Sequence, residues 1–203
     1  MSPEATTSRP RRYAAYARQS VVLLIVLAVL LGIVYPLFIT GIGRAFFHDK
    51  AEGSLLVQNG KVVGSRLIGQ PFTDPSYFWS RPSATSPYPY NGGASTGSNL
   101  GPTNPALLQA ITDRIAALRA ADPGNDAPVP IDLVTASGSG LDPDISPAAA
   151  EYQAARVARA RGISVDTVRG LVAKYTIGRQ LGFLGEPRVN VLQLNLALNA
   201  LVK

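Results

Sequence analysis

Few residues in this sequence are able to carry chemistry. Among 203 residues, His48 is the only histidine, and cysteine is absent. A multi-histidine metal site therefore cannot form, no Ser-His-Asp set is recognisable around His48, and no thiolate is available as nucleophile or ligand. The acidic residues are scattered rather than paired on one helix face, where acid–base catalysis would place them. The sequence chemistry predicts neither a catalytic site nor a metal site.

Two glycine-containing stretches partly match phosphate-binding patterns. The loop that begins with Gly92 and Gly93 lacks the lysine and the strand-to-helix setting of a P-loop. Gly41 and Gly43 begin a dinucleotide-type pattern, but Phe46 occupies the place of the third glycine. That second match is spurious. Gly92 and Gly93 are kept as candidates for nucleotide contact.

Two charged clusters have both a structural and a ligand-binding interpretation. Arg156, Arg159 and Arg161 form the densest positive group outside the N-terminal region. They fit a solvated helix face whose charges complement the helix dipole, and contact with a nucleotide is the alternative. Asp142 and Asp144 resemble the start of a calcium loop, but the downstream glycine and glutamate are missing. A turn that leads into a helix cap is the better interpretation.

An aromatic cluster lies beside an arginine in the first third of the chain. Phe72 is followed by Tyr77, Phe78 and Trp79, and Arg81 comes next to them. Such a cluster is able to stack a nucleobase, but no basic stripe accompanies it. We therefore expect these rings to fill the core and predict no nucleic-acid partner.

An uncharged apolar run at residues 21–40 organises the chain. It is about as long as the roughly 20 residues that a helix needs to cross a bilayer. No polar position interrupts its first half, as one would in a core helix. A cleaved signal peptide has a shorter apolar core that ends in small residues, whereas Tyr35 and Pro36 follow here. We predict an uncleaved transmembrane helix over 20–42 behind a basic tail, 1–19.

The charges that flank the run predict its orientation. Before it stand Arg9, Arg11, Arg12 and Arg18 against Glu4, whereas Arg44 and Lys50 after it are balanced by Asp49 and Glu52. Basic residues stay on the cytoplasmic side of a span. The tail should therefore be cytoplasmic and residues 43–203 extracytoplasmic.

The outer end of the predicted span carries features that a solitary span seldom needs. Pro36 loosens a helix, and small residues allow another helix to approach closely. We expect contacts with partner helices at Gly32, Tyr35, Pro36, Gly41 and Gly43.

The remaining residues are enough for one loop-rich α+β domain. Half of the net charge of +6 lies in the tail, so the outer domain is only mildly basic. Without cysteine it has no disulfides and depends on its core, and 16 Pro and 19 Gly predict many loops. The expected elements are a hairpin with Asn59-Gly60 at its turn, whose second strand reaches Ile68; a loop at 87–103; helices at 105–119, 147–161 and 165–174, capped by Asn104, Ser146 and Ser164; a strand at 131–135; and an ambiguous segment at 189–201 that favours helix.

Several stretches resemble a known family in consistent order from about residue 20 to the C-terminus. They are Tyr35 to Gly43, Gly64 to Phe72, Tyr77 to Ala84, Ser95 to Pro105, Asp132 to Pro147 and Val189 to Asn195. Together they look like the C chain of the potassium-transporting Kdp ATPase, the KdpC family. The agreement along most of the chain is far more specific than any one motif.

The resemblance implies an accessory subunit of a bacterial inner-membrane complex. A channel-like A subunit would take up K⁺, a P-type ATPase B subunit would hydrolyse ATP, and a short F peptide would pack alongside. The C chain would act as a catalytic chaperone that raises the ATP affinity of the B subunit, without binding a cofactor tightly itself. Since the predicted orientation keeps the outer domain away from cytosolic ATP, we expect coupling through the span.

Two other classes of function stay open. One is a membrane-anchored enzyme, which the single histidine and the lack of cysteine disfavour. The other is a membrane-anchored extracytoplasmic binding module that works without partner subunits.

Overall fold

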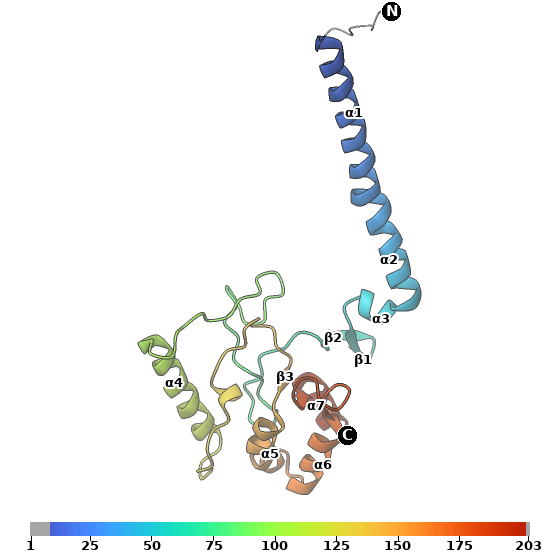
Figure 1. Cartoon of the computed structure of the whole chain (residues 1–203). Helices are drawn as coiled ribbons and strands as arrows, with labels where there is room; N and C mark the ends of the chain where they lie inside the picture. Colours follow the sequence, from blue (N-terminus) through green and yellow to red (C-terminus); the bar gives the residue numbers. More distant parts are fainter. Residues whose placement is uncertain (1–8, 202–203) are drawn as a thin grey trace, which may run out of the picture. The chain divides into compact units, whose positions relative to one another are not determined.

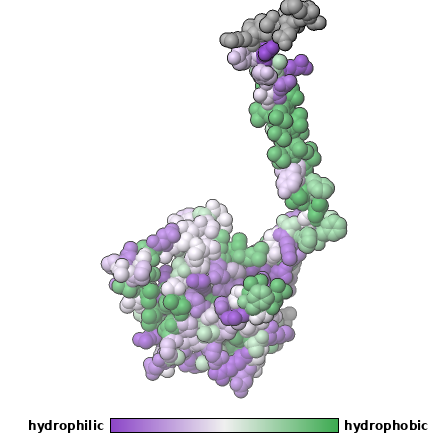
Figure 2. Space-filling view, viewed as in Figure 1, coloured by the Kyte–Doolittle hydropathy of each residue, from purple (hydrophilic) through white to green (hydrophobic). Residues whose placement is uncertain are grey.

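The computed structural model describes residues 9–201. These form two compact units, which divide between Gly53 and Ser54. The first unit is a long helix followed by a single short one (Figure 1). Its elements are α1 (Arg9–Val29), the π-helical turn η1 (Leu30–Val34), α2 (Tyr35–Phe46) and α3 (His48–Ala51). Residues 12–46 have the length and composition of a membrane span and are exposed, and Figure 2 shows their apolar surface.

The π-helical turn ends at Val34, two residues before Pro36. Proline has no N–H, and its ring collides with the carbonyl four residues earlier, here that of Gly32. The helix adapts by widening: the N–H of Tyr35 donates to the carbonyl of Leu30, five residues back. The loosening expected at Pro36 therefore takes the form of one wide turn inside a continuous helix.

The second unit begins with the expected hairpin, β1 (Leu55–Gln58) and β2 (Lys61–Ser65). Asn59 and Gly60 both have positive φ, as a tight two-residue turn between antiparallel strands requires. The prediction that the second strand reaches Ile68 is wrong. The N–H of Leu67 donates to the hydroxyl of Ser65 at 3.1 Å, and the chain turns there.

The capped helices are confirmed within two residues at each end. They are α4 (Pro105–Ala121), α5 (Pro147–Arg161) and α6 (Val165–Tyr175). Asn104, Ser146 and Ser164 each accept a hydrogen bond from a backbone N–H of the first turn.

The strand predicted at 131–135 is wrong, because the chain forms the short 3₁₀ helix η2 (Ile131–Leu133). Its burial does not alternate: Ile131 is exposed, whereas Leu133 and Val134 are both buried. The hydroxyl of Thr135 donates to the carbonyl of Ile131 at 2.8 Å and closes the turn.

A small antiparallel sheet and a last helix complete the unit. The sheet has the order β3 (Asp144–Ile145), β5 (Arg188–Asn190) and β4 (Thr176–Ile177). Asp142 accepts from the N–H of Asp144, so these aspartates form the expected turn before the α5 cap. The ambiguous C-terminal segment forms β5 and then α7 (Val191–Leu201), with Asn190 accepting from the N–H of Gln193.

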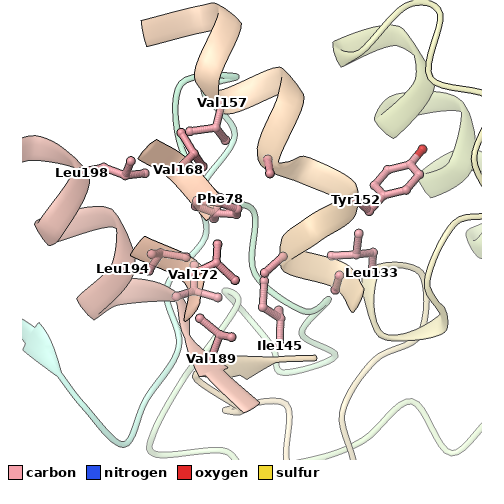
Figure 3. Close-up of a cluster of buried hydrophobic side chains, with 14 of the residues drawn as sticks. Phe78, Leu133, Ile145, Tyr152, Val157, Val168, Val172, Val189, Leu194 and Leu198 are labelled. Carbon is pink, nitrogen blue, oxygen red and sulfur yellow. The ribbon is translucent and has the colours of Figure 1, made fainter. Parts of the chain in front are cut away.

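The core lies where α5, α6, α7 and the sheet meet. Phe78 is fully buried at its centre, between Val157, Val168 and Leu194 (Figure 3). Phe72 and Trp79 pack partly buried against the same cluster. The expected core role is therefore confirmed for Phe72, Phe78 and Trp79, whereas Tyr77 contacts Phe72 and Arg161 outside the core cluster.

Candidate functional site

The most elaborate polar arrangement in the second unit holds the segment 74–79, which lies between β2 and α4. Asn195 of α7 accepts from the N–H of Phe78 at 2.9 Å and donates to its carbonyl at 3.0 Å. Gln153 of α5 does the same for Trp79, at 2.7 and 3.2 Å. Each amide acts as a neighbouring strand would, because it satisfies both backbone groups of one residue. We call this segment and the side chains that bind it the clamp.

Two arginines complete the clamp. Arg156 donates to the carbonyl of Pro75 and to Gln153, and its guanidinium lies 4.7 Å from the centre of the Trp79 ring. Arg161 donates to the carbonyl of Ser76 at 2.6 Å. It also donates to Asn199 and lies 4.8 Å from the Tyr77 ring. Both cations therefore rest on aromatic faces and bind backbone carbonyls.

The electrostatics of the clamp follow from burial. Arg156 is only 3 % exposed, and burial lowers its pKa to about 10, because water no longer solvates the cation. The guanidinium is still charged at neutral pH, and the carbonyl and amide acceptors take over the role of water.

The arginines predicted as one positive face are separated in the structure. Arg156 is buried in the clamp, so the solvated face is wrong for this residue. Arg159 is 61 % exposed and pairs with the buried carboxylate of Asp122 instead of entering the clamp. Arg161 is half-buried against Tyr77. A solvent-borne anion therefore has the freest access to Arg159 and partial access to Arg161, whereas Arg156 is buried.

The glycine candidates lie in the long loop that follows the clamp. Gly92 and Gly93 are exposed, and the N–H of Gly93 donates to the side chain of Asn91 at 3.0 Å. The loop is fastened further on, where Thr96 donates its N–H to the carbonyl of Ser139. The hydrogen bonds and ion pairs seen among residues 9–201 do not join these glycines to the α5 arginines.

A cleft of about 660 Å³ is formed by the segment that resembles the KdpC family between 132 and 147. Arg81 pairs with Asp142 at 3.1 Å, and Arg188 pairs with Asp144 at 3.0 Å. Burial raises the pKa of Asp144. Asp132 accepts from the N–H of Ser146 and so supports the α5 cap. Over residues 9–201 no group of three metal-ligating side chains occurs, and the cleft's charges largely neutralise each other.

The residues predicted to contact partner helices lie on the exposed helix of the first unit. A side chain added at Gly32 or Gly41 would meet nothing within 4 Å, and one at Gly43 would meet Ala51 at 3.8 Å. One face of the helix carries Gly32, Pro36 and Gly43, which are spaced by four and then seven residues. Tyr35 lies beside this face. Gly41 faces away from that side.

Gln153 and Asn195 are the residues of the clamp that the sequence did not single out. Both are about 1 % exposed, and their partners lie 74 and 117 residues away. The available signal was weak: each is a polar residue with apolar neighbours in a helix, which predicts a buried hydrogen-bonding role without naming the partner.

Comparisons with known proteins identify the family of this chain. The family model described as "K+-transporting ATPase, c chain" matches residues 17–200. The potassium-transporting ATPase KdpC subunit of Methylococcus capsulatus is 65% identical over 184 residues, which cover 91% of this chain and 97% of the relative. The KdpC subunit of Sorangium cellulosum is 65% identical over 185 residues, 91% of this chain and 97% of that one.

The matched residues include the apolar helix with its π-helical turn, the clamp and the terminal helix. Both the apolar helix of the first unit and the second unit therefore fall inside the similarity. The chain belongs to the KdpC family, the c chain of K⁺-transporting ATPases.

Proposed function

We propose that this chain is a non-catalytic subunit of the Kdp high-affinity, ATP-driven potassium uptake complex. The carrying observation is the similarity to KdpC relatives along nearly the whole chain, anchor included. The contacts of the second unit support an accessory role. Its buried amides and arginines bind the protein's own backbone, an arrangement that builds a rigid body rather than a reaction centre.

In this proposal the chain crosses the bacterial inner membrane once, with its N-terminus cytoplasmic. The Arg-rich tail supports this orientation, and so does the ion pair of Arg44 with Glu52 at 3.2 Å, which offsets positive charge at the other end. The partners are the channel-like A subunit, the P-type ATPase B subunit and the F peptide. ATP hydrolysis belongs to the B subunit.

With the N-terminus cytoplasmic, the outer domain lies on the opposite side of the membrane from ATP. The chaperone role therefore requires coupling across the membrane. Two sites are coupled when each ligand favours the same state of an intervening element. In this proposal η1, where a wide turn sits near Pro36, serves as that element. ATP need not touch this chain. If it does, Gly92, Gly93 and Arg159 are the most exposed of the candidate residues.

The ATP dependence of hydrolysis tests the chaperone role. Complex lacking this chain should need several-fold more ATP for half-maximal hydrolysis than the complete complex. Arg159→Ala should leave the ATP concentration for half-maximal hydrolysis by the complete complex unchanged, because Arg159 binds Asp122 on the outer domain. A several-fold rise with Arg159→Ala would instead indicate direct nucleotide contact and reverse the proposed orientation.

Purification from native membranes through a C-terminal affinity tag tests the subunit role. Recovery of a P-type ATPase and a channel-like subunit in fixed ratio is the expected result. Recovery of the chain alone, with ligand binding retained by the outer domain, would overturn the proposal in favour of a self-sufficient binding module.

A matched pair of substitutions tests the helix contacts. Gly32→Leu places a large side chain on the face that includes Pro36, and Gly41→Leu places the same side chain on another face. Neither glycine has a neighbour of its own chain within 4 Å, so the isolated chain should tolerate both changes. We expect Gly32→Leu to reduce recovery of the partners at least several-fold and Gly41→Leu to leave it intact. Equal recovery with both variants would contradict this contact face.

A further inference from the structure

The segment that joins β4 to β5 exposes an unusual amount of apolar surface. Ile177, Leu181, Phe183 and Leu184 are 45 %, 84 %, 69 % and 47 % exposed. They lie within eight residues of each other, whereas Leu108 and Ile131, which are also exposed, stand far apart in the sequence. Apolar atoms gather on the face seen in Figure 2, at the place where Figure 1 draws the loop before α7. We call residues 177–186 the apolar hairpin.

The apolar hairpin is built as a rigid projection. At its base Thr176 pairs with Val189 and Ile177 with Arg188, across β4 and β5. Near its tip Gln180 and Leu184 exchange backbone hydrogen bonds of 2.8 and 2.9 Å. A projection that is already ordered loses little conformational entropy when it binds.

The tip carries a large side chain at a position that suits glycine better. Leu181 has φ of +52°, in the left-handed region that costs a side-chain-bearing residue about 1–3 kcal/mol when it is held there. Gly182, its neighbour, has φ of +84° and carries no such cost. The leucine neither fills the core nor relaxes the turn, so a role outside this chain accounts for it.

The rim of the hairpin indicates what kind of surface it meets. Arg179 pairs with Glu186 at 2.7 Å, so the two charges beside the apolar tip cancel. A loop that inserts among anionic lipids usually has an excess of basic residues. An apolar centre within a balanced polar rim is the anatomy of a protein–protein interface. Exposed aromatic and aliphatic anchors of this kind carry much of the binding energy at such interfaces.

We propose that the apolar hairpin docks the outer domain into an apolar depression on another subunit of the ATPase complex. Leu181 and Phe183 are its anchors, and the Arg179–Glu186 pair surrounds them. This inference rests on the proposed function, since it requires a complex to dock on. It adds a second contact to that of the span, at a site formed by a different part of the chain.

Photo-crosslinking in native membranes tests the contact directly. A photoreactive phenylalanine analogue in place of Phe183 should yield, on irradiation, an adduct of this chain with another subunit. The same analogue in place of Leu108, which is 54 % exposed on α4, controls for unspecific capture. An adduct from position 183 with a second copy of this chain, or with lipid alone, would overturn the proposal. So would equal yields of the same adduct from both positions.

The paired variant Leu181→Ser with Phe183→Ser tests the contribution to assembly. We expect recovery of the docked subunit to fall at least threefold in detergent, while Leu108→Ser recovers the wild-type amount. Thermal unfolding of the tagged chain should be unchanged, because both side chains are exposed. If wild-type chain recovers its partners and the paired variant recovers them equally, the docking inference fails alone. If wild-type chain recovers no partner, the proposed function fails.

Discussion

The clamp and the apolar hairpin distribute polar and apolar side chains in opposite ways. In the clamp an amide, Asn195, and a cation, Arg156, are almost fully buried. In the hairpin Leu181 and Phe183 are mostly exposed. The clamp's polar groups all have partners within this chain, whereas the hairpin's apolar groups pack on little of it.

The difference separates residues that build the domain from residues that are available to partners. Buried polar groups are tolerated only when they are hydrogen-bonded, so the clamp should tolerate little change. Exposed apolar groups contribute little to folding, so substitutions in the hairpin should mainly affect binding. In this chain the buried polar residues serve the fold, and the exposed apolar residues are the ones we propose for binding.

Asn195→Ala is the substitution with the largest expected effect on stability. It leaves the N–H and carbonyl of Phe78 buried without partners and opens a cavity in the core. We expect a loss of about 3–5 kcal/mol in the free energy of unfolding. Trp79, the only tryptophan, reports the transition by fluorescence during denaturation of the full chain in detergent.

Asn199→Ala, one helical turn later, is the control for that variant. The side chain of Asn199 accepts one hydrogen bond, from Arg161 at 2.9 Å. Its loss should lower the free energy of unfolding by about 0.5–1.5 kcal/mol. Equal losses from the two variants would show that the clamp has no special importance for the fold.

The clamp also explains how far sequence reasoning reaches in this chain. The caps at Asn104, Ser146 and Ser164 were predictable because the acceptor and its N–H lie within three residues. The burial of Arg156 was not, because its acceptor, the carbonyl of Pro75, is 81 residues away. Local chemistry is readable from a sequence, whereas the partner of a long-range hydrogen bond is not.

The strands show the same limit. The Asn59-Gly60 hairpin was predictable from its turn. By contrast, β3 and β4 have two residues each and β5 has three. Strands this short cannot be recognised from alternating apolar and polar residues. The apolar hairpin was missed with them, since its exposure follows from the pairing of β4 with β5.

Tyr90, in the long loop that follows the clamp, makes stability depend on pH. Its hydroxyl donates to the carbonyl of Arg81, and burial raises its pKa from 10.0 to about 12. Between these values the unfolded chain has lost this proton while the folded chain keeps it. Stability is therefore full below pH 10 and falls as the pH rises toward 12, by roughly 2–3 kcal/mol in total.

Tyr90→Phe removes this contribution and leaves the other tyrosines in place. We expect the difference in unfolding free energy between wild type and variant to shrink by that amount from pH 9 to pH 12. Denaturation in detergent at each pH, followed by Trp79 fluorescence, measures it. A difference that stays constant with pH would mean that the hydroxyl is not held in the folded state.

Leu181→Gly has the smallest expected effect on stability and tests the other side of the comparison. Glycine relieves the positive φ of residue 181 but adds freedom to the unfolded chain, and the two effects largely cancel. We expect a change within about 1 kcal/mol, together with reduced recovery of the docked subunit. Leu108→Gly, in the exposed part of α4, should cost about 1 kcal/mol through helix propensity and leave recovery intact. A loss of more than about 2 kcal/mol from Leu181→Gly would place that leucine among the residues that build the domain, and the contrast with the clamp would disappear.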